Sequence, residues 1–206
     1  MKSKYLALLS IVFTSLIFIS CQPGFEDKYE AQNQLVNGVK EGKWVEHFDS
    51  VDKPAKDSNA PFYKLIAYKA GNPVGIVRDY FKDGTLYSET PYKDGKANGI
   101  QIDYDKAGNL LAKAPYVNGK LNGVVEEYWE NGKILSACPY IDGKINGNYV
   151  AYNRDGQIEH EATYKNDKED GSYKQYQVNG KLMFEAQFKD GKIVNRKDYD
   201  LYGKQI

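Results

Sequence analysis

Short runs of alternating side chains recur along most of the chain. In the run Leu86, Ser88, Thr90 and Tyr92, every second position holds a large apolar, a small or an aromatic residue, while the opposite face carries Glu89, Pro91 and, just after the run, Lys93. Because successive side chains of a β-strand point to opposite faces, this alternation predicts strands with one packed and one solvated face. The packed face of the next two copies reads Leu110, Ala112, Ala114, Tyr116 and then Ile134, Ser136, Cys138, Tyr140.

The strands belong to a repeat of about 24 residues. An aromatic residue opens each unit, two glycines and a second tyrosine follow, and a third glycine closes the unit. The full series are Tyr68, Tyr92, Tyr116, Tyr140, Tyr164 and Phe188; Gly71, Gly95, Gly119, Gly143 and Gly191; Gly75, Gly99, Gly123, Gly147 and Gly171; Tyr80, Tyr104, Tyr128, Tyr152 and Tyr176; and Gly84, Gly108, Gly132, Gly156 and Gly180. A fixed period of this length is the signature of an array stabilised by contacts between neighbouring units.

Asn-Gly and Asp-Gly pairs separate the runs, as at Asn118-Gly119 and Asn131-Gly132. Such pairs suit tight hairpin turns, and the runs between them are long enough for one strand but too short for a strand and a helix. We therefore expect an all-β fold, an elongated single-layer antiparallel β-meander of hairpin repeats of about 24 residues. We further expect the second tyrosines to form ladders along the sheet, and Pro91, Pro115 and Pro139 to lie where a strand ends or bulges.

The array spans residues 35–206 in this interpretation. Residues 35–61 form a degenerate first unit with an insertion loop, residues 62–182 the regular units, and residues 183–206 a degenerate C-terminal cap. Residues 21–34 are polar and charged and are expected to be a tether.

The N-terminus predicts export. Lys2 and Lys4 precede an uncharged, mostly apolar run over Tyr5–Ile19, and Ser20-Cys21 follows it. This is typical of a signal peptide over residues 1–20, with too short an apolar run for a comfortable membrane span. The segment Phe18-Ile19-Ser20-Cys21 resembles a bacterial lipobox, although Phe18 replaces the usual leucine. That resemblance implies lipidation of Cys21, and an ordinary signal peptide with an incidental cysteine is the alternative. We expect a lipid anchor in the cell envelope, in the outer membrane rather than the inner one.

The pattern Tyr140, Gly143, Gly147, Tyr152 and Gly156 resembles the MORN-repeat variant family. The resemblance covers nearly all of residues 35–206 and departs from the better-known MORN motif, which has Tyr-x-Gly near its start. Bacterial variant proteins are often labelled as antitoxins of the YwqK type, which implies partner binding rather than catalysis. With a lipoprotein signal, that label suits an immunity protein that faces an exported toxin.

No constellation of residues predicts chemistry. Cys138 and His160 share a face, but they lie on equivalent strands of adjacent units, about 10 Å apart, which is too far for base activation. His47 and His160 lack the spacing of metal ligands, and no glycine-rich phosphate loop occurs. A formal net charge of zero gives no indication of a nucleic-acid partner. We expect no enzyme activity, no cofactor and no metal.

The remaining candidate is the sheet margin, where lysines follow the turn glycines. Lys96, Lys120, Lys133 and Lys144, with Trp129, are the candidate partner-binding residues. Lysines that only keep turns soluble and discourage edge pairing are the alternative. The sequence thus favours an envelope lipoprotein that binds or scaffolds a protein partner. Two further hypotheses are an antitoxin or immunity protein specific for one toxin, and a module that binds lipid headgroups or glycans through lysines and aromatic residues.

Overall fold

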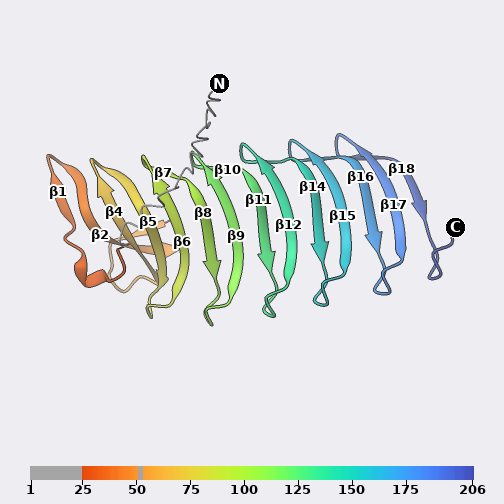
Figure 1. Ribbon diagram of the computed structural model, residues 1–206. Helices are drawn as coiled ribbons and strands as arrows, with labels where there is room; N and C mark the ends of the chain where they lie inside the picture. Colours follow the sequence, from red (N-terminus) through yellow and green to blue (C-terminus); the bar gives the residue numbers. More distant parts are fainter. Residues whose placement is uncertain (1–24, 51–52) are drawn as a thin grey trace, which may run out of the picture.

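The computed structural model describes residues 25–50 and 53–206, which form one antiparallel sheet built as a meander (Figure 1). The predicted all-β fold with one hairpin unit after another is confirmed. The elements are a 3₁₀ turn η1 (Lys28–Glu30) and the strands β1 (Gln34–Val36), β2 (Val39–Ser50), β3 (Lys53–Ala55), β4 (Phe62–Lys69), β5 (Asn72–Phe81), β6 (Leu86–Lys93), β7 (Lys96–Ala97), β8 (Gly99–Tyr104), β9 (Leu110–Val117), β10 (Lys120–Leu121), β11 (Gly123–Tyr128), β12 (Ile134–Ile141), β13 (Lys144–Ile145), β14 (Gly147–Tyr152), β15 (Ile158–Lys165), β16 (Lys168–Tyr176), β17 (Leu182–Lys189) and β18 (Lys192–Asp198).

The turns have the backbone conformation that Asx-Gly pairs favour. Asn118 and Gly119 both have positive φ, of 51° and 81°, as a type I′ turn between β9 and β10 requires. Equivalent turns recur at each hairpin on this side of the sheet, and we call this edge the first margin. The turns that contain Gly84, Gly108, Gly132, Gly156, Gly180 and Gly203 form the second margin at the opposite ends of the strands.

The prolines lie within strands, opposite an irregularity in the partner strand. Pro115 is paired with Ile100 on one side, and on the other side its carbonyl oxygen accepts a hydrogen bond from Asn122 N (2.9 Å), the residue between β10 and β11. The position where proline lacks an N–H therefore faces a break in the neighbouring strand, whereas the prolines themselves lie within strands and not at a strand end as expected.

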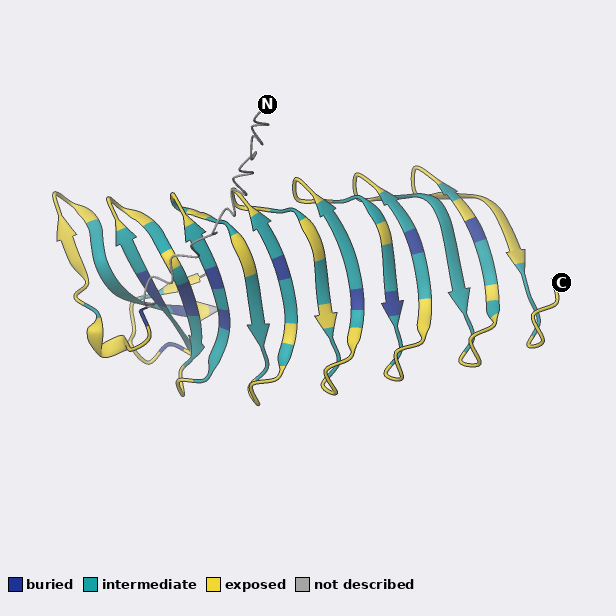
Figure 2. Ribbon diagram, in the orientation of Figure 1, coloured by how far each residue is buried: buried dark blue, intermediate teal, exposed yellow. Residues whose placement is uncertain are grey.

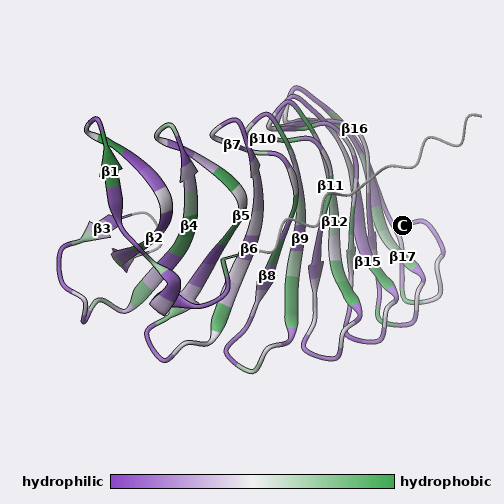
Figure 3. Cartoon of the chain, turned by 60° about the vertical axis from the view of Figure 1, so that its left-hand side comes forward, coloured by the Kyte–Doolittle hydropathy of each residue, from purple (hydrophilic) through white to green (hydrophobic). Residues whose placement is uncertain are grey.

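The register divides the side chains between two faces. On the small-residue face lie Ser88, Thr90, Ala114, Ser136, Ala151, Ala162 and Ala186, each at most 9% exposed, which are the dark bands along the array in Figure 2. The other face carries Tyr80, Tyr104, Tyr128, Tyr152 and Tyr176 together with Glu126, Glu161 and Glu185, and we call it the tyrosine–glutamate face. Turned by 60°, the strands are seen to bend in the same sense, so the array is a curved sheet (Figure 3).

The N-terminal end of the array is capped and contains the largest buried side chains. Leu65 is 1% exposed, and Phe25 packs on the same face at 3% exposed, where its carbonyl oxygen accepts a hydrogen bond from Arg78 Nη1 (2.9 Å). Within residues 21–34, for which the sequence predicts a tether, Phe25 is therefore docked on the sheet, while residues 26–30 are exposed. Strands β1 and β3 pair with β2, whereas β18 pairs with β17 alone and has only exposed residues before Asp198.

Nothing in this structure bears on the signal peptide or on Cys21, which lie outside the described residues. Within residues 25–50 and 53–206, no helix has the length and apolar character needed to cross a membrane.

Candidate binding surface

The structure divides the five predicted margin residues between two edges. Lys96, Lys120 and Lys144 begin β7, β10 and β13 at the first margin, while Trp129 and Lys133 belong to the turn between β11 and β12 at the second margin. One strand length separates the two groups. The five residues therefore do not form a single surface.

The second-margin residues bind the next unit of the array. Trp129 Nε1 donates to the carbonyl oxygen of Tyr152 (3.1 Å), Asn131 Nδ2 to that of Arg154 (3.0 Å) and Lys133 Nζ to that of Asp155 (2.9 Å). The Arg154 guanidinium lies over the Trp129 ring at 5.2 Å. The same arrangement recurs two units later, where Gln177, Asn179 and Lys181 contact the carbonyl oxygens of residues 200–202. Trp129 and Lys133 thus hold neighbouring turns together.

The first margin has its own connection between turns. The backbone N–H of Gly119 donates to the carbonyl oxygen of Ala97, and that of Gly143 to Leu121, each at 2.8 Å. A side chain at Gly119 would meet the Lys96 stem at 3.7 Å, so that stem lies against the following turn. Lys96, Lys120 and Lys144 are all exposed at this margin.

The small-residue face contains a row of carboxylates that sequence reasoning missed. Asp79 pairs with Ser88, Ser88 with Asp103, Asp103 with Ala112, and Ala112 with Glu127, so these side chains follow one line across the strands. We call Asp79, Asp103 and Glu127 the carboxylate row. Its signal was present in the sequence, since the three residues lie 24 positions apart.

The charges in this row are compensated unequally. Asp79 forms an ion pair with Lys64 (2.8 Å). Asp103 accepts two hydrogen bonds from Gln101 Nε2 (2.8 and 3.1 Å), and Glu127 accepts one from Ser136 Oγ (2.7 Å). In the described part of the chain neither Asp103 nor Glu127 has an ion-pair partner. The hydrogen bonds that these two carboxylates accept therefore come from neutral donors only.

An aromatic row runs beside the carboxylates, nearer to the first margin. Tyr92 pairs with Gly75, Tyr116 with Gly99, and Tyr140 with Gly123, so the most regular tyrosine and glycine of the repeat are cross-strand partners. A Cβ added at Gly99 or Gly123 would meet Pro91 or Pro115 of the neighbouring strand and not the tyrosine ring. The aromatic row consists of Tyr68, Tyr92, Tyr116, Tyr140, Tyr164 and Phe188.

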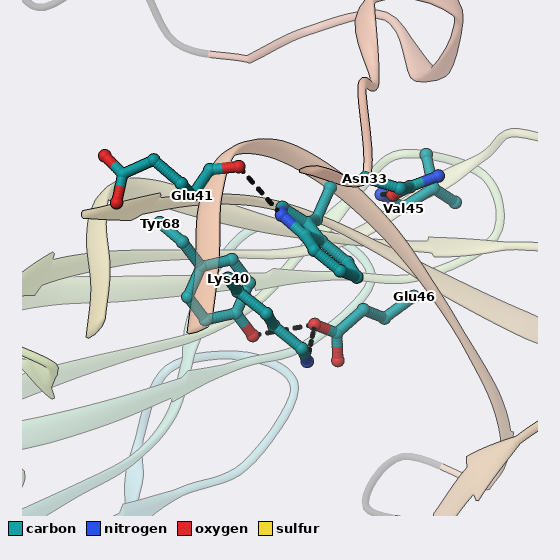
Figure 4. A network of polar contacts seen from close by, with 7 residues as sticks. Asn33, Lys40, Glu41, Val45, Glu46 and Tyr68 are labelled. Atoms are coloured by element: carbon teal, nitrogen blue, oxygen red, sulfur yellow. Dashed lines mark hydrogen bonds and ion pairs between the residues drawn. The ribbon is translucent and has the colours of Figure 1, made fainter. Parts of the chain in front are cut away.

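At the N-terminal end, Tyr68 joins the polar network drawn in Figure 4. Its hydroxyl donates to Glu46 Oε1 (2.7 Å), which also accepts from Lys40 Nζ (2.5 Å), and Trp44 Nε1 donates to the carbonyl oxygen of Glu41 (2.9 Å). Burial, and then the hydrogen bond to the Glu46 carboxylate, raise the pKa of Tyr68. The positive charge of Lys40 and the negative charge of Glu46 therefore compensate each other.

Between the two rows lies a floor of mostly small side chains. We call Thr90, Gln101, Ala114, Val125 and Cys138 the floor row; each lies two residues along its strand from the carboxylate row or its small-residue partners. A hollow of about 530 Å³ opens here, lined by Lys64, Asp79, Thr90, Tyr92, Lys96, Gln101 and Tyr116 among others. Beside it, Ser88 is 3% exposed, and its Oγ has no hydrogen-bond partner among the described residues.

Aromatic rings close the floor row toward the C-terminus. Tyr149 lies 5.4 Å from His160, His160 is stacked on Tyr173 (5.9 Å), and Tyr173 on Phe184 (5.4 Å), with the Arg196 guanidinium 4.1 Å from the Phe184 ring. This ring ladder joins neighbouring strands. The ladder predicted from Tyr80, Tyr104, Tyr128, Tyr152 and Tyr176 is wrong, because another strand separates each pair and rings about 10 Å apart cannot touch.

Cys138 and His160 are not brought into contact. Strand β14 lies between them, and Cys138 interacts instead with Tyr140, while burial raises the pKa of its thiol. Phe81 and Tyr87 are not free aromatic side chains at the margin, because both pack against Phe62 (5.7 and 6.5 Å between rings). The described residues contain no group of three or more His, Cys, Asp or Glu side chains placed to hold a metal ion.

Comparison with known proteins settles the family. The model of the MORN repeat variant matches five consecutive stretches, residues 73–94, 97–118, 121–142, 145–166 and 169–190, which together exceed half of the chain. The chain belongs to the MORN repeat variant family. Each match begins in the first strand after a first-margin turn and ends in the next such turn, so a MORN repeat here is two long strands and the second-margin turn between them. No curated protein matches this MORN repeat chain.

The solved structures that match part of the chain include two of TarM. One is TarM from S. aureus, as a mutant in complex with fondaparinux, α-GlcNAc-glycerol and UDP, at 15% identity and a TM-score of 0.33 over 46% of this chain. The other is a crystal structure of TarM, at 16% identity and a TM-score of 0.33 over 48% of this chain. The chain spans about a fifth of the length of these structures, 19% and 20% respectively.

Proposed function

We propose that this MORN repeat protein is a non-enzymatic lipoprotein of the bacterial cell envelope that binds or scaffolds a protein partner on its small-residue face. One observation carries the proposal: in the middle of the array, from β6 to β12, the small-residue face holds polar groups without charged partners, whereas glutamates of the other face are paired. On the tyrosine–glutamate face, Tyr176 and Lys174 both contact Glu161, and Tyr199 and Lys197 both contact Glu185. On the small-residue face, the carboxylates of Asp103 and Glu127 and the hydroxyl of Ser88 lack such partners among the described residues.

The position of Phe25 supports an orientation for the anchored protein. Phe25 is docked on the tyrosine–glutamate face, four residues after the proposed lipidated Cys21. Four extended residues span at most about 14 Å, so the anchor holds the N-terminal end of that face near the bilayer. The small-residue face then points away from the membrane, where a partner reaches it.

Gentle crosslinking in the native cells, followed by mass spectrometry of the captured proteins, tests this proposal. Three variants accompany the native protein: Cys21→Ser to release it from the membrane, Glu127→Lys on the small-residue face, and Glu130→Lys as the matched control. Glu130 is exposed in the second-margin turn three residues away and undergoes the same change of charge.

We expect one protein in near-equal amount to the bait, captured by the native chain and by Glu130→Lys but lost with Glu127→Lys and Cys21→Ser. If that protein is a toxin, the partner role becomes an immunity role. Equal capture by the two charge variants contradicts the assignment to this face. Capture of no protein above background contradicts partner binding altogether and favours lipid or glycan binding through the first-margin lysines.

A further inference from the structure

The three rows on the small-residue face share one repeat distance. Equivalent residues of consecutive units lie two strands apart, and strands in a sheet are about 4.8 Å apart, so each row repeats every ~9.6 Å along the array. This applies to Asp79, Asp103 and Glu127 in the carboxylate row and to Tyr92, Tyr116 and Tyr140 in the aromatic row. A ligand that lies along the array and meets every unit in the same way needs this period.

A polyproline II segment has nearly this period. It advances ~3.1 Å per residue with three residues per turn, so every third side chain points the same way at intervals of ~9.3 Å. Over the two steps from Asp79 to Glu127, the mismatch amounts to only ~0.6 Å. An α-helix presents a similar side chain every seven residues, or ~10.5 Å, and accumulates ~1.8 Å over the same distance. An extended β-strand repeats every ~6.7 Å and falls out of register at once.

The width and chemistry of the surface fit the three columns of side chains of such a segment. A chain lying on the floor row has the carboxylate row on one side and the aromatic row on the other, each ~6.7 Å away along the strands. Thr90 and Ala114 have small side chains, and their low exposure, 7% and 9%, shows that larger neighbours stand above them, as along the bottom of a groove. Aromatic-lined grooves are a known mode of recognising proline-rich segments.

Charge and hydrogen bonding select among such segments. Asp103 and Glu127 form no ion pair within residues 25–50 and 53–206, which favours Lys or Arg in the column that faces them. Gln101 Nε2 and Ser136 Oγ donate hydrogen bonds to these two carboxylates but carry no charge, so the negative charges remain for a basic side chain. The ring ladder that starts at Tyr149 ends the floor row, so the surface accommodates about three turns.

We propose that the small-residue face between β5 and β12 binds an extended, polyproline II-type segment of a partner protein with a basic residue at every third position. The proposal rests on the partner-binding function proposed above and identifies the chemistry of the partner. The basic column contacts Asp103 and Glu127, the proline column packs on Tyr92, Tyr116 and Tyr140, and the third column faces solvent.

Binding of synthetic peptides to the full chain, followed by fluorescence anisotropy, tests the proposal. The probe is a twelve-residue peptide of four Lys-Pro-Pro units; the controls are a peptide of the same composition with its four lysines adjacent, and a helical peptide with lysines seven residues apart. We expect the periodic peptide to bind about five-fold more tightly than either control. The doubly substituted chain Asp103→Asn, Glu127→Gln should bind it about five-fold more weakly, whereas Glu130→Gln leaves binding unchanged, and added salt weakens it.

Equal affinity for the periodic and adjacent-lysine peptides, or an unchanged affinity after the double substitution, overturns the proposal. Tighter binding of the helical peptide overturns it as well and assigns the surface to a helix. The partner-binding function is judged separately: capture in cells that is lost with Glu127→Lys, together with no preference for the periodic peptide, refutes this inference and leaves the proposed function standing. If neither the capture in cells nor the preference for the periodic peptide is observed, both the proposed function and this inference are refuted.

Discussion

At the residue scale, the second glycine of each repeat shows how one position serves two needs. Gly123 has φ of 123°, a conformation that side chains rarely adopt, and a Cβ built there would lie 2.8 Å from Pro115 Cγ. Gly99 and Gly147 face Pro91 and Pro139 in the same way. The glycine of one strand and the proline of the adjacent strand therefore depend on each other. The second glycine of the repeat is needed for this packing contact as well as for its backbone conformation.

Gly123→Ala should lower the free energy of unfolding by about 3 kcal/mol, because both the backbone and the proline ring must shift. Gly132→Ala is the matched control: its φ is 78°, but no atom lies within 4 Å of the added methyl, so only about 1 kcal/mol should be lost. Urea unfolding of the full chain measures both values. Equal losses in the two variants would show that the contact with Pro115 is unimportant.

Tyr128 gives the array a measurable weakness in alkali. Burial, and then the hydrogen bond that its hydroxyl donates to Glu126 (2.6 Å), raise the pKa of Tyr128 to about 12, from an ordinary value of 10.0. A pKa raised on folding contributes stability that is complete below pH 10 and is lost as the pH rises toward 12. The stability difference between the native chain and Tyr128→Phe should therefore fall across this window. Urea unfolding at pH 9 and pH 11.5 tests it, and a constant difference would refute it.

At the element scale, the turns do more than reverse the chain. First-margin turns are joined by backbone hydrogen bonds, and second-margin turns by side chains such as Trp129, Asn131 and Lys133 that reach the next unit. Each hairpin is thus tied to its successor at both ends and along its strands. A repeat contacts only its neighbours, so these connections set how cooperatively the array unfolds.

Asn131→Ala should loosen one such connection locally. The variant loses the hydrogen bond from Nδ2 to the carbonyl oxygen of Arg154 and the one that Oδ1 accepts from Lys133 N (3.0 Å), at a cost of about 1–2 kcal/mol. Hydrogen exchange should quicken over residues 128–156 and stay unchanged over β4 and β5. Glu130→Ala, beside it in the same turn, should have no effect, and uniform acceleration along the chain would argue against a local connection.

Most of the strands and turns were predictable, because they depend on local sequence. The alternation around Leu86–Tyr92 and pairs such as Asn118-Gly119 specify strands and turns without reference to the rest of the chain. What escaped prediction depends on register. Lys120 and Lys133 look alike in sequence, yet one intervening strand sends them to opposite margins. The ring ladder required knowing that Tyr149 lies beside His160 of the adjacent strand, and the docking of Phe25 involves Arg78, 53 positions away.

At the scale of the whole molecule, stability is distributed unevenly along the array. Leu65, Ile66 and Val77 are at most 6% exposed near the N-terminal end, where residues 25–33 cover the sheet. Toward the C-terminus, Ile193 and Val194 of β18 are 52% and 65% exposed. One end of the molecule therefore has a core in the ordinary sense, and the other relies on cross-strand contacts.

Truncation after Gly191, which removes β18, should leave the remaining strands folded with little loss of stability. Deletion of residues 25–33 should instead destabilise the array by several kcal/mol, because it exposes Leu65 and leaves the buried Arg78 without the Phe25 carbonyl. Circular dichroism with thermal unfolding, combined with hydrogen exchange, separates these cases. Global unfolding on loss of β18 would contradict the gradient.

The uninterrupted backbone ladder at the first margin has a consequence for how such a protein changes over generations. Since each unit contacts only the next, an in-frame duplication of one 24-residue coding unit between β9 and β12 extends the array by ~9.6 Å without disturbing either end. The number of repeats then sets the length of the exposed surface in steps of one repeat. It also sets the length of the partner segment that this surface can bind.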